Sequence, residues 1–311
     1  MKAVHFRRFG GTEVLEYDDL PEPVLGPDHV LVRMRAAALN PIDWKAREGL
    51  LAPMMETVFP VVTGFDLAGV VERTGLAVTE YAPGDEVMGF VWPDLLGRGT
   101  FAEVVSAPVR TVVPKPPGLS WAEAAALPLS GLAAYQSLVH RLRVGRGDTV
   151  LVHAAAGGVG VFAVQIAVAL GARVIGTASE GNHGFLRSLG AEPVAYRGAS
   201  AERIRALAPE GVDAVLDAAG KRALRSSPDL LAPGGRLVSV ADPQVTALGG
   251  QYVFARPCAD DLTELGRMTG DGRVRVEIAR TFPLEKAADA HELIRMGHTR
   301  GKLVVTADHL T

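Results

Sequence analysis

The stretch VLVHAAAGGVG at residues 150–160 is the most informative segment of the chain. A run of apolar and β-branched residues, the expected strand over 149–153, leads into a glycine-rich turn and then into an apolar segment expected to be helical over 159–170. Strand, glycine turn and helix in this order form a dinucleotide-binding fingerprint, in which free N–H groups at the helix start face a pyrophosphate. The residues expected to hold the pyrophosphate are Ala156, Gly157, Gly158, Val159 and Gly160.

The turn departs from the usual pattern at one place. Gly157 lets the backbone approach a pyrophosphate and Gly160 lets the helix pack against the strand, but Ala155 replaces the first glycine. The alternative interpretation is a glycine-rich turn of an α/β core that binds nothing. The strand before it and the helix after it favour dinucleotide binding.

The rest of the chain shows two different patterns of apolar and β-rich segments. From about residue 148 apolar runs alternate with helical segments, which predicts a parallel, doubly wound sheet. The expected strands are 149–153, 173–177, 214–217 and 236–240, and the expected helices are 159–170, 184–189, 201–207 and 223–231. The first 120 residues instead carry short β-rich runs between Gly and Pro, which predicts an antiparallel, barrel-like domain. The capping-box pattern of Ser120 and Glu123 predicts a helix over 123–127.

Composition excludes several classes. The chain has 311 residues, 48% hydrophobic and 22% charged, which suits one large or two ordinary globular domains. Its net charge of −3 and the absence of a basic stripe argue against nucleic-acid or membrane partners. Its single cysteine, Cys258, rules out a disulfide framework within one chain and a zinc site of several thiolates. The charged start has no secretory signal pattern, so the expected location is cytoplasmic.

The second expected strand indicates which dinucleotide binds. NAD enzymes usually place a carboxylate at its end to bind ribose hydroxyls, but this chain has Ser179 there. A hydroxyl leaves room for a 2′-phosphate, which favours NADPH over NADH. Glu180 follows directly and argues the other way, while His183 and Arg187 could provide donors or simply face solvent.

Motifs along the whole chain resemble the medium-chain dehydrogenase/reductase superfamily, and within it the zinc-independent quinone oxidoreductase-like branch. Besides the fingerprint, they are NPIDWK at 40–45, GFDLAG at 64–69, GDEV at 84–87, AAALPL at 124–129, LAPGGRLV at 231–238 and RGKLV at 300–304. The resemblance implies an α/β chain with a GroES-like β-barrel domain over 1–120, completed by 257–311, and a Rossmann domain over 121–256. It also implies a homodimer in which the strand around Tyr252 joins the two sheets.

The resemblance also bears on metal. Zinc-dependent members use cysteine where this chain has Asn40 and a His-Glu pair where it has Phe65 and Asp66. Because Asn40, Phe65 and Leu129 cannot supply the three ligands of a catalytic zinc, no metal is expected. Asp66 is interpreted as a structural carboxylate that binds backbone N–H groups. His291 and His298 are interpreted as residues of a surface helix.

Site residues follow from the resemblance. Asn40, Lys45 and Tyr252 are expected to be catalytic, with Asn40 contacting substrate or nicotinamide and Lys45 stabilising or protonating an enolate. Asn40 could instead shape a turn and Lys45 could point to water. The further cofactor contacts expected are Ser179 and Tyr196 at the adenosine 2′-phosphate or adenine, Lys302 at the same phosphate, and Ala218 and Val240 at the ribose and nicotinamide.

The expected function is metal-free NADPH-dependent reduction of a quinone or α,β-unsaturated carbonyl, a small-molecule substrate. Without zinc to polarise a carbonyl, substrates that accept hydride readily fit best. Two alternatives remain open: an enoyl-thioester reductase of a biosynthetic pathway, and a non-catalytic NADPH-binding sensor or accessory protein.

Overall fold

The computed structural model describes residues 1–307, which form parts of two compact units. Unit 1 contains Met1–Leu129, Arg256–Gly270 and the segment from Val276 onward, and unit 2 contains Ser130–Ala255 and Asp271–Arg275. Unit 1 thus extends to Leu129, beyond the domain boundary expected at residue 121. Helix α2 (Trp121–Ala126) belongs to unit 1 because it packs against β3 (His29–Leu39) and β5 (Asp66–Thr74).

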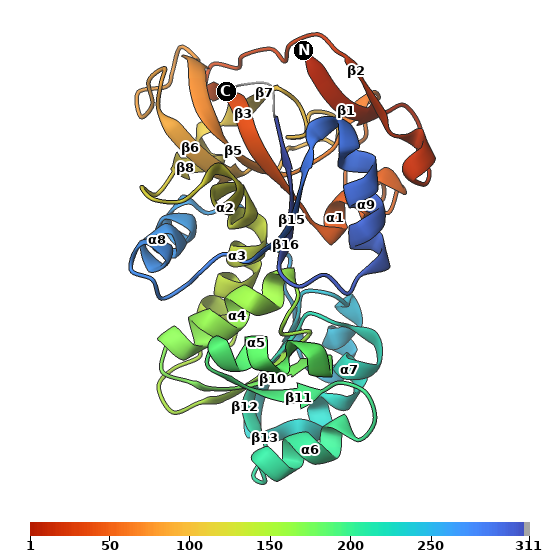
Figure 1. The fold of residues 1–311 in the computed structure, drawn as a ribbon, viewed down its shortest axis with the longest axis vertical. Coiled ribbons are helices and arrows are strands. Elements are labelled where there is room, and N and C mark those ends of the chain that lie inside the picture. The colour runs from red at the N-terminus through yellow and green to blue at the C-terminus, as the bar shows by residue number, and fades with distance from the viewer. Residues whose placement is uncertain (308–311) are drawn as a thin grey trace. The chain divides into compact units, whose positions relative to one another are not determined.

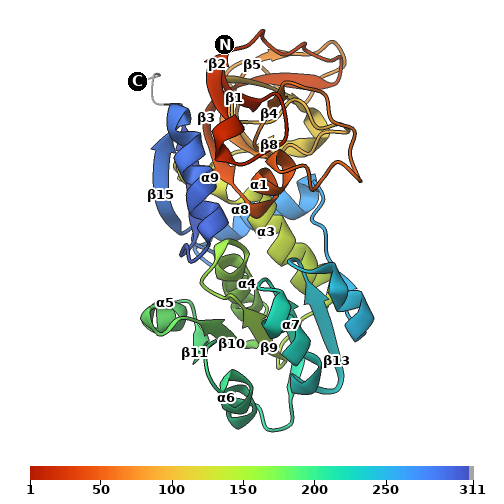
Figure 2. The ribbon, with the colours of Figure 1, turned by 90° about the vertical axis from the view of Figure 1, so that its right-hand side faces the viewer.

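Unit 2 is built on a parallel sheet with the strand order β11-β10-β9-β12-β13-β14. The strands are β9 (Thr149–His153), β10 (Arg173–Ala178), β11 (Ala191–Ala195), β12 (Val212–Asp217), β13 (Leu231–Ser239) and β14 (Gln251–Tyr252). Helices flank this sheet (Figures 1 and 2): α4 (Gly158–Ala169), α5 (His183–Ser188), α6 (Ser200–Leu207) and α7 (Lys221–Ser226). This arrangement confirms the Rossmann-like, doubly wound sheet expected from the sequence.

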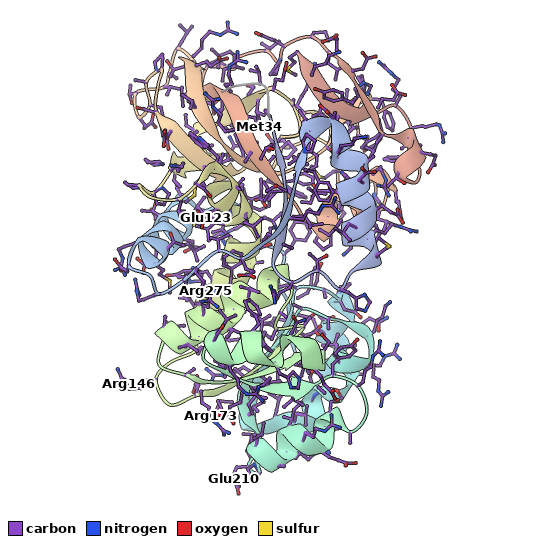
Figure 3. All side chains as sticks on the ribbon, in the orientation of Figure 1. Met34, Glu123, Arg146, Arg173, Glu210 and Arg275 are labelled. Carbon is purple, nitrogen blue, oxygen red and sulfur yellow. The ribbon has the colours of Figure 1, made fainter. Side chains whose placement is uncertain are left out.

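Strand order predicts where unit 2 would bind a ligand. The chain leaves β9 and moves to β10 and β11 on one side, then crosses to β12 and β13 on the other. Open parallel sheets bind ligands at the carboxyl ends of the strands where the order reverses. Arg146 and Arg173, labelled in Figure 3, mark the opposite, amino ends of β9 and β10.

Of the two edge strands of unit 2, β14 was expected from the resemblance and β11 was not. β11 contains Glu192 and Pro193 and shows no apolar alternation. Proline is tolerated because β11 lies at the edge, with β10 as its neighbour in the sheet. The two-residue strand β14 forms the other edge and pairs with β13.

Unit 1 contains the expected, mostly antiparallel GroES-like sheet. Its path is β15-β16-β3-β5-β6-β8, with β7 also paired to β3, and a smaller sheet has the order β2-β1-β4. The other strands are β1 (Lys2–Phe6), β2 (Glu16–Asp19), β4 (Val61–Val62), β6 (Glu86–Phe90), β7 (Val104–Pro108), β8 (Val112–Pro114), β15 (Ile278–Pro283) and β16 (Lys302–Thr306). The remaining helices are α1 (Pro41–Arg47), α3 (Pro128–Tyr135), which crosses the unit boundary, α8 (Ala259–Gly270) and α9 (Ala287–Met296). Figure 2 shows α9 lying against β15.

Local signals explain how two of these helices begin. Ser120 and Glu123 form the predicted capping box, and α2 starts at the next residue, Trp121. In α1 the Asp43 carboxylate accepts a hydrogen bond of 2.6 Å from the backbone N–H of Asn40, and Pro41 occupies the first helical position. Within residues 1–307, each helix is too short or too polar to cross a membrane.

Candidate functional site

The glycine-rich turn of unit 2 connects β9 to α4. Gly157 is the N-cap residue of α4. Within the described residues, the backbone N–H groups at this end of the helix receive no capping hydrogen bond from the N-cap side chain. Gly158 and Val159 are partly exposed, while Gly160 is buried. A Cβ at Gly160 would lie 2.2 Å from the carbonyl oxygen of Ala154, so only glycine fits there. An uncapped helix start carries free N–H groups and a positive dipole end, which suits a pyrophosphate.

The replacement of the first glycine by Ala155 is accommodated within the sheet. The backbone N–H of Ala155 donates to the carbonyl of Thr177 at 2.9 Å, which holds the turn against β10. The neighbouring position on β10 is Gly176, and a Cβ there would lie 2.9 Å from the Cβ of Ala155. The absence of a side chain at Gly176 therefore leaves room for the methyl group of Ala155.

The residues expected at the adenosine end lie together. Ser179 follows β10 and Tyr196 follows β11, and the N–H of Tyr196 donates to the carbonyl of Ala178 at 3.1 Å. Both side chains are exposed, so both can meet a ligand. Their contact with a cofactor remains a prediction.

Arg197 is a further residue of this group that the sequence reasoning missed. Its Nε donates to the Tyr196 hydroxyl at 3.2 Å, and its guanidinium lies 5.5 Å from the centre of the Tyr196 ring. Arg203 of α6 donates to the carbonyl of Arg197 at 3.2 Å. A tyrosine followed by arginine after a strand was a usable signal, but β11 had not been recognised as a strand.

His153, the last residue of β9, is a buried residue that the sequence reasoning also passed over. Its ring nitrogens lie 3.2 Å from the hydroxyls of Thr177 and Ser227, which connect β9 to β10 and to the end of α7. Burial lowers the pKa of His153 to about 4, so the imidazole is neutral near pH 7. These contacts connect the end of β9, just before the glycine-rich turn, to β10 and α7.

Unit 1 contains a buried polar cluster formed by Asn40, Asp43, Asp66 and Lys302, which we call the Asp66 cluster. Asp66 accepts from the Asn40 side-chain amide at 2.8 Å and from the backbone N–H of Leu129 at 2.8 Å. The Lys302 ammonium donates to the Asn40 side-chain oxygen at 2.5 Å and lies 3.7 Å from Asp66. The interpretation of Asp66 as a structural carboxylate that binds a backbone N–H group is confirmed.

Charge in the Asp66 cluster is distributed unevenly. Burial raises the pKa of Asp43 to about 8 and that of Asp66 to about 6, and burial lowers the pKa of Lys302 against the opposing effect of the two carboxylates. Both oxygens of Asp66 accept hydrogen bonds, whereas one oxygen of Asp43 has no hydrogen-bond partner within the described residues. With one ammonium beside two buried carboxylates, Asp43 therefore keeps a proton to higher pH than Asp66.

The position of Lys302 does not fit the phosphate contact expected for it. Its side chain is 3% exposed and its ammonium also donates to the carbonyl of Leu39 at 3.1 Å. A cation held in this way neutralises Asp66 and has no exposed surface for a phosphate. Sequence reasoning could not show this, because it does not say toward which face of β16 the side chain points.

The three residues expected to be catalytic have different surroundings. The Asn40 side chain is 1% exposed and hydrogen-bonded to Asp66 and Lys302, so it is part of the buried hydrogen-bond network of the Asp66 cluster. Lys45 is half-buried, with its ammonium 5.9 Å from the centre of the Trp44 ring. Tyr252 is the last residue of β14 in unit 2, where it packs against the hydrophobic core, and burial raises the pKa of its phenol. Their catalytic roles remain predictions.

The surface-helix interpretation of His291 is wrong. His291 lies on α9 as expected, but its side chain is fully buried and its ring meets Phe101 edge to face at 5.9 Å. Burial lowers its pKa to about 3. His298 lies beyond the end of α9 and is exposed. Within residues 1–307, no group of three or more His, Cys, Asp or Glu residues is arranged to hold a metal ion.

Comparison with known proteins agrees with this architecture. Two family models match, the alcohol dehydrogenase GroES-like domain over residues 26–117 and zinc-binding dehydrogenase over residues 189–305. The quinone oxidoreductase of Pseudomonas aeruginosa is 35% identical over 98% of this chain and 99% of its own. The chloroplast envelope quinone oxidoreductase homolog of Arabidopsis thaliana is 31% identical, with 98% of each chain covered. The NADPH-dependent alkenal/one oxidoreductase of the same plant is 34% identical over 98% of this chain and 79% of its own.

Solved structures give the same result. The quinone oxidoreductase from Coxiella burnetii has a TM-score of 0.89 at 36% identity, with 99% of each chain covered. A mycobacterial protein complexed with NADPH has a TM-score of 0.85 at 30% identity, covering 98% of this chain and 100% of its own. The enoyl reductase CurK has a TM-score of 0.84 at 28% identity, with 98% of each chain covered.

A GroES-like sheet in one unit and a Rossmann-like sheet with a glycine-rich turn in the other define a dehydrogenase-type oxidoreductase. The chain belongs to the medium-chain dehydrogenase/reductase superfamily, in its quinone oxidoreductase-like branch.

Proposed function

We propose that the protein is a zinc-independent reductase that uses NADPH and acts on quinones or α,β-unsaturated carbonyls. The observation that carries the proposal is the uncapped start of α4 behind Gly157, at the carboxyl end of β9. It offers an anion site where an open parallel sheet binds a dinucleotide. A bound nicotinamide would supply hydride, and the chain's residues would hold and orient the cofactor.

The adenosine end supports NADPH over NADH. Ser179, which directly follows β10, carries no carboxylate, and Arg197 beside Tyr196 adds a positive charge with several N–H donors. Arg197 is the basic residue that would contact the 2′-phosphate. The names of the alkenal/one oxidoreductase and of the mycobacterial complex also support NADPH.

The Asp66 cluster supports a reaction that needs no zinc. Asp66 already accepts hydrogen bonds from Leu129 and Asn40, and the Lys302 ammonium is its cation. A metal ion there would have to displace this ammonium from a fully buried position. A substrate that accepts hydride without a Lewis acid is consistent with this arrangement.

One structural relative suggests a second candidate substrate. The similarity to the enoyl reductase CurK supports an enoyl thioester as the second candidate substrate.

The edge position of β14, with Phe254 next to it 42% exposed, supports a homodimer that joins two unit 2 sheets. Light scattering on the purified protein tests the dimer, and a monomer at micromolar concentration contradicts it.

The function is tested by following NADPH absorbance with quinones, enones and an enoyl thioester as acceptors, with NADH run in parallel. We expect NADPH-selective turnover of a quinone or enone. Turnover of the thioester alone would favour the second candidate. Cofactor binding without turnover of any acceptor would favour a sensor or accessory protein.

A further inference from the structure

Two neighbouring strands of unit 2 end in a buried pair of polar side chains. These two residues were not among the site residues expected from the sequence. Asp217 is the last residue of β12 and Ser239 is the last residue of β13, and they face each other in the parallel register. Both side chains are fully buried. The Ser239 hydroxyl donates to the Asp217 carboxylate at 2.6 Å, a short charge-assisted hydrogen bond.

Each member of the pair holds the loop that follows its own strand. The Asp217 carboxylate accepts from the backbone N–H groups of Ala219 at 3.0 Å and Gly220 at 2.9 Å. The Ser239 hydroxyl accepts from the backbone N–H groups of Ala241 at 3.1 Å and Asp242 at 3.0 Å. One hydrogen bond between two side chains therefore connects four backbone contacts.

The two loops are also joined directly. The N–H of Val240 donates to the backbone carbonyl of Asp217 at 3.0 Å, and the N–H of Lys221 donates to the Asp242 carboxylate at 3.3 Å. Gly220 has a φ of +69°, and a Cβ there would lie 3.3 Å from the Cβ of Asp242. Residues 218–221 and 240–242 thus form one cross-braced structure at the carboxyl ends of β12 and β13.

These hydrogen bonds make the two loops differ from the glycine-rich turn in the backbone groups that they can offer to a ligand. The N–H groups of residues 219–221 and 240–242 are all used within the protein. A ligand beside these loops therefore meets backbone acceptors, which suit ribose hydroxyls and a carboxamide NH₂. The start of α4 instead presents donors, which suit phosphate.

Strand order assigns the loops to one half of the cofactor. β10 and β11, which carry Ser179 and Tyr196, lie on one side of β9, and β12 and β13 lie on the other. A dinucleotide with its pyrophosphate at the β9 turn extends its two halves to opposite sides of that strand. With the adenosine half at β10 and β11, the nicotinamide half lies at β12 and β13.

We propose that Asp217 and Ser239 are a positioning pair that holds loops 218–221 and 240–242 in place for the nicotinamide half of the cofactor. The pair touches no ligand itself and acts through the backbone around Ala218 and Val240. This role rests on the proposed binding of NADPH.

The test compares two ligands that share the adenosine half. Isothermal titration measures the affinity for NADPH and for 2′,5′-ADP, which lacks the nicotinamide half. We expect Ser239→Ala to weaken NADPH about tenfold, equal to about 1.4 kcal/mol, and to leave 2′,5′-ADP within twofold. The matched control is Ser137→Ala, which removes another fully buried hydroxyl of unit 2, bonded to the carbonyl of Ala133 at 2.6 Å. It is expected to change neither affinity.

Asp217→Asn provides a second variant should Ser239→Ala fold poorly, which thermal unfolding reveals. The amide keeps an oxygen for Ala219 and Gly220 but replaces the charged partner of Ser239, so a smaller loss in the same direction is expected. Equal losses for both ligands, or unchanged NADPH affinity in both variants, would overturn the proposal. If the unmodified protein bound neither ligand, the proposed cofactor would itself be wrong.

Discussion

Replacing Gly160 by alanine is expected to damage cofactor binding because the new methyl group has no space. Its Cβ would lie 2.2 Å from the carbonyl oxygen of Ala154 and 2.7 Å from the Cα of Ala155, whereas ordinary contacts begin at 3.4 Å. Both neighbours are backbone atoms, so the turn and the start of α4 must separate by about 1 Å. Overpacking of this kind costs about 1–3 kcal/mol, and a misplacement of about 1 Å at a binding site can cost about a hundredfold.

We therefore expect Gly160→Ala to raise the dissociation constant of NADPH by about 10- to 100-fold. The melting temperature should fall by several degrees, at about 2–4 °C per kcal/mol. Fluorescence titration and thermal unfolding measure the two effects. Gly145→Ala is the matched control, because Gly145 precedes the opposite end of β9 and a Cβ there meets no atom within 4 Å. The reasoning is refuted if Gly160→Ala binds NADPH within twofold of the unmodified protein.

Three other changes test the charged groups. Lys302→Met removes the cation beside the buried Asp66 and should cost about 3–5 kcal/mol of stability in urea unfolding; a loss below 1 kcal/mol contradicts the assigned ion pair. Because burial raises the pKa of Asp43 from 3.8 to about 8, the folded protein binds more protons than the unfolded chain in this interval, and stability falls as pH rises through it. Asp43→Asn should flatten that pH profile, and an unchanged slope would mean that Asp43 is ionised throughout. Arg197→Ala should weaken NADPH about tenfold and leave NADH unchanged, with Arg146→Ala at the far end of the sheet as control; an equal effect on both cofactors contradicts a 2′-phosphate contact.

Sequence patterns predicted the parts of the fold that carry strong local signals. β9 was located to the residue, because a run of apolar and β-branched residues stands there between Asp148 and the glycine-rich turn. The capping box placed the start of α2 within two residues. β11 lacked such a signal: Pro193 and Glu192 argue against a strand, and only pairing with β10 makes it one.

The candidate site was harder to predict because side-chain environment depends on tertiary packing. Lys302 looks like a surface cation near the end of the chain, yet β16 pairs with β3 and buries it beside Asn40. His291 lies on a helix rich in charged residues but faces the core. Arg197 went unnoticed because β11 was not recognised, whereas the glycine-rich turn was found because its spacing is set by backbone sterics.

The most direct test of metal-free, NADPH-dependent reduction is turnover after metal removal. The protein is treated with a strong zinc chelator, its metal content is measured by mass spectrometry, and NADPH oxidation is followed with the best quinone or enone acceptor. We expect full activity at less than about 0.05 zinc ions per chain, a level too low to support turnover by a four-ligand catalytic site. Activity that disappears with the chelator and returns on addition of zinc would contradict zinc-independent reduction.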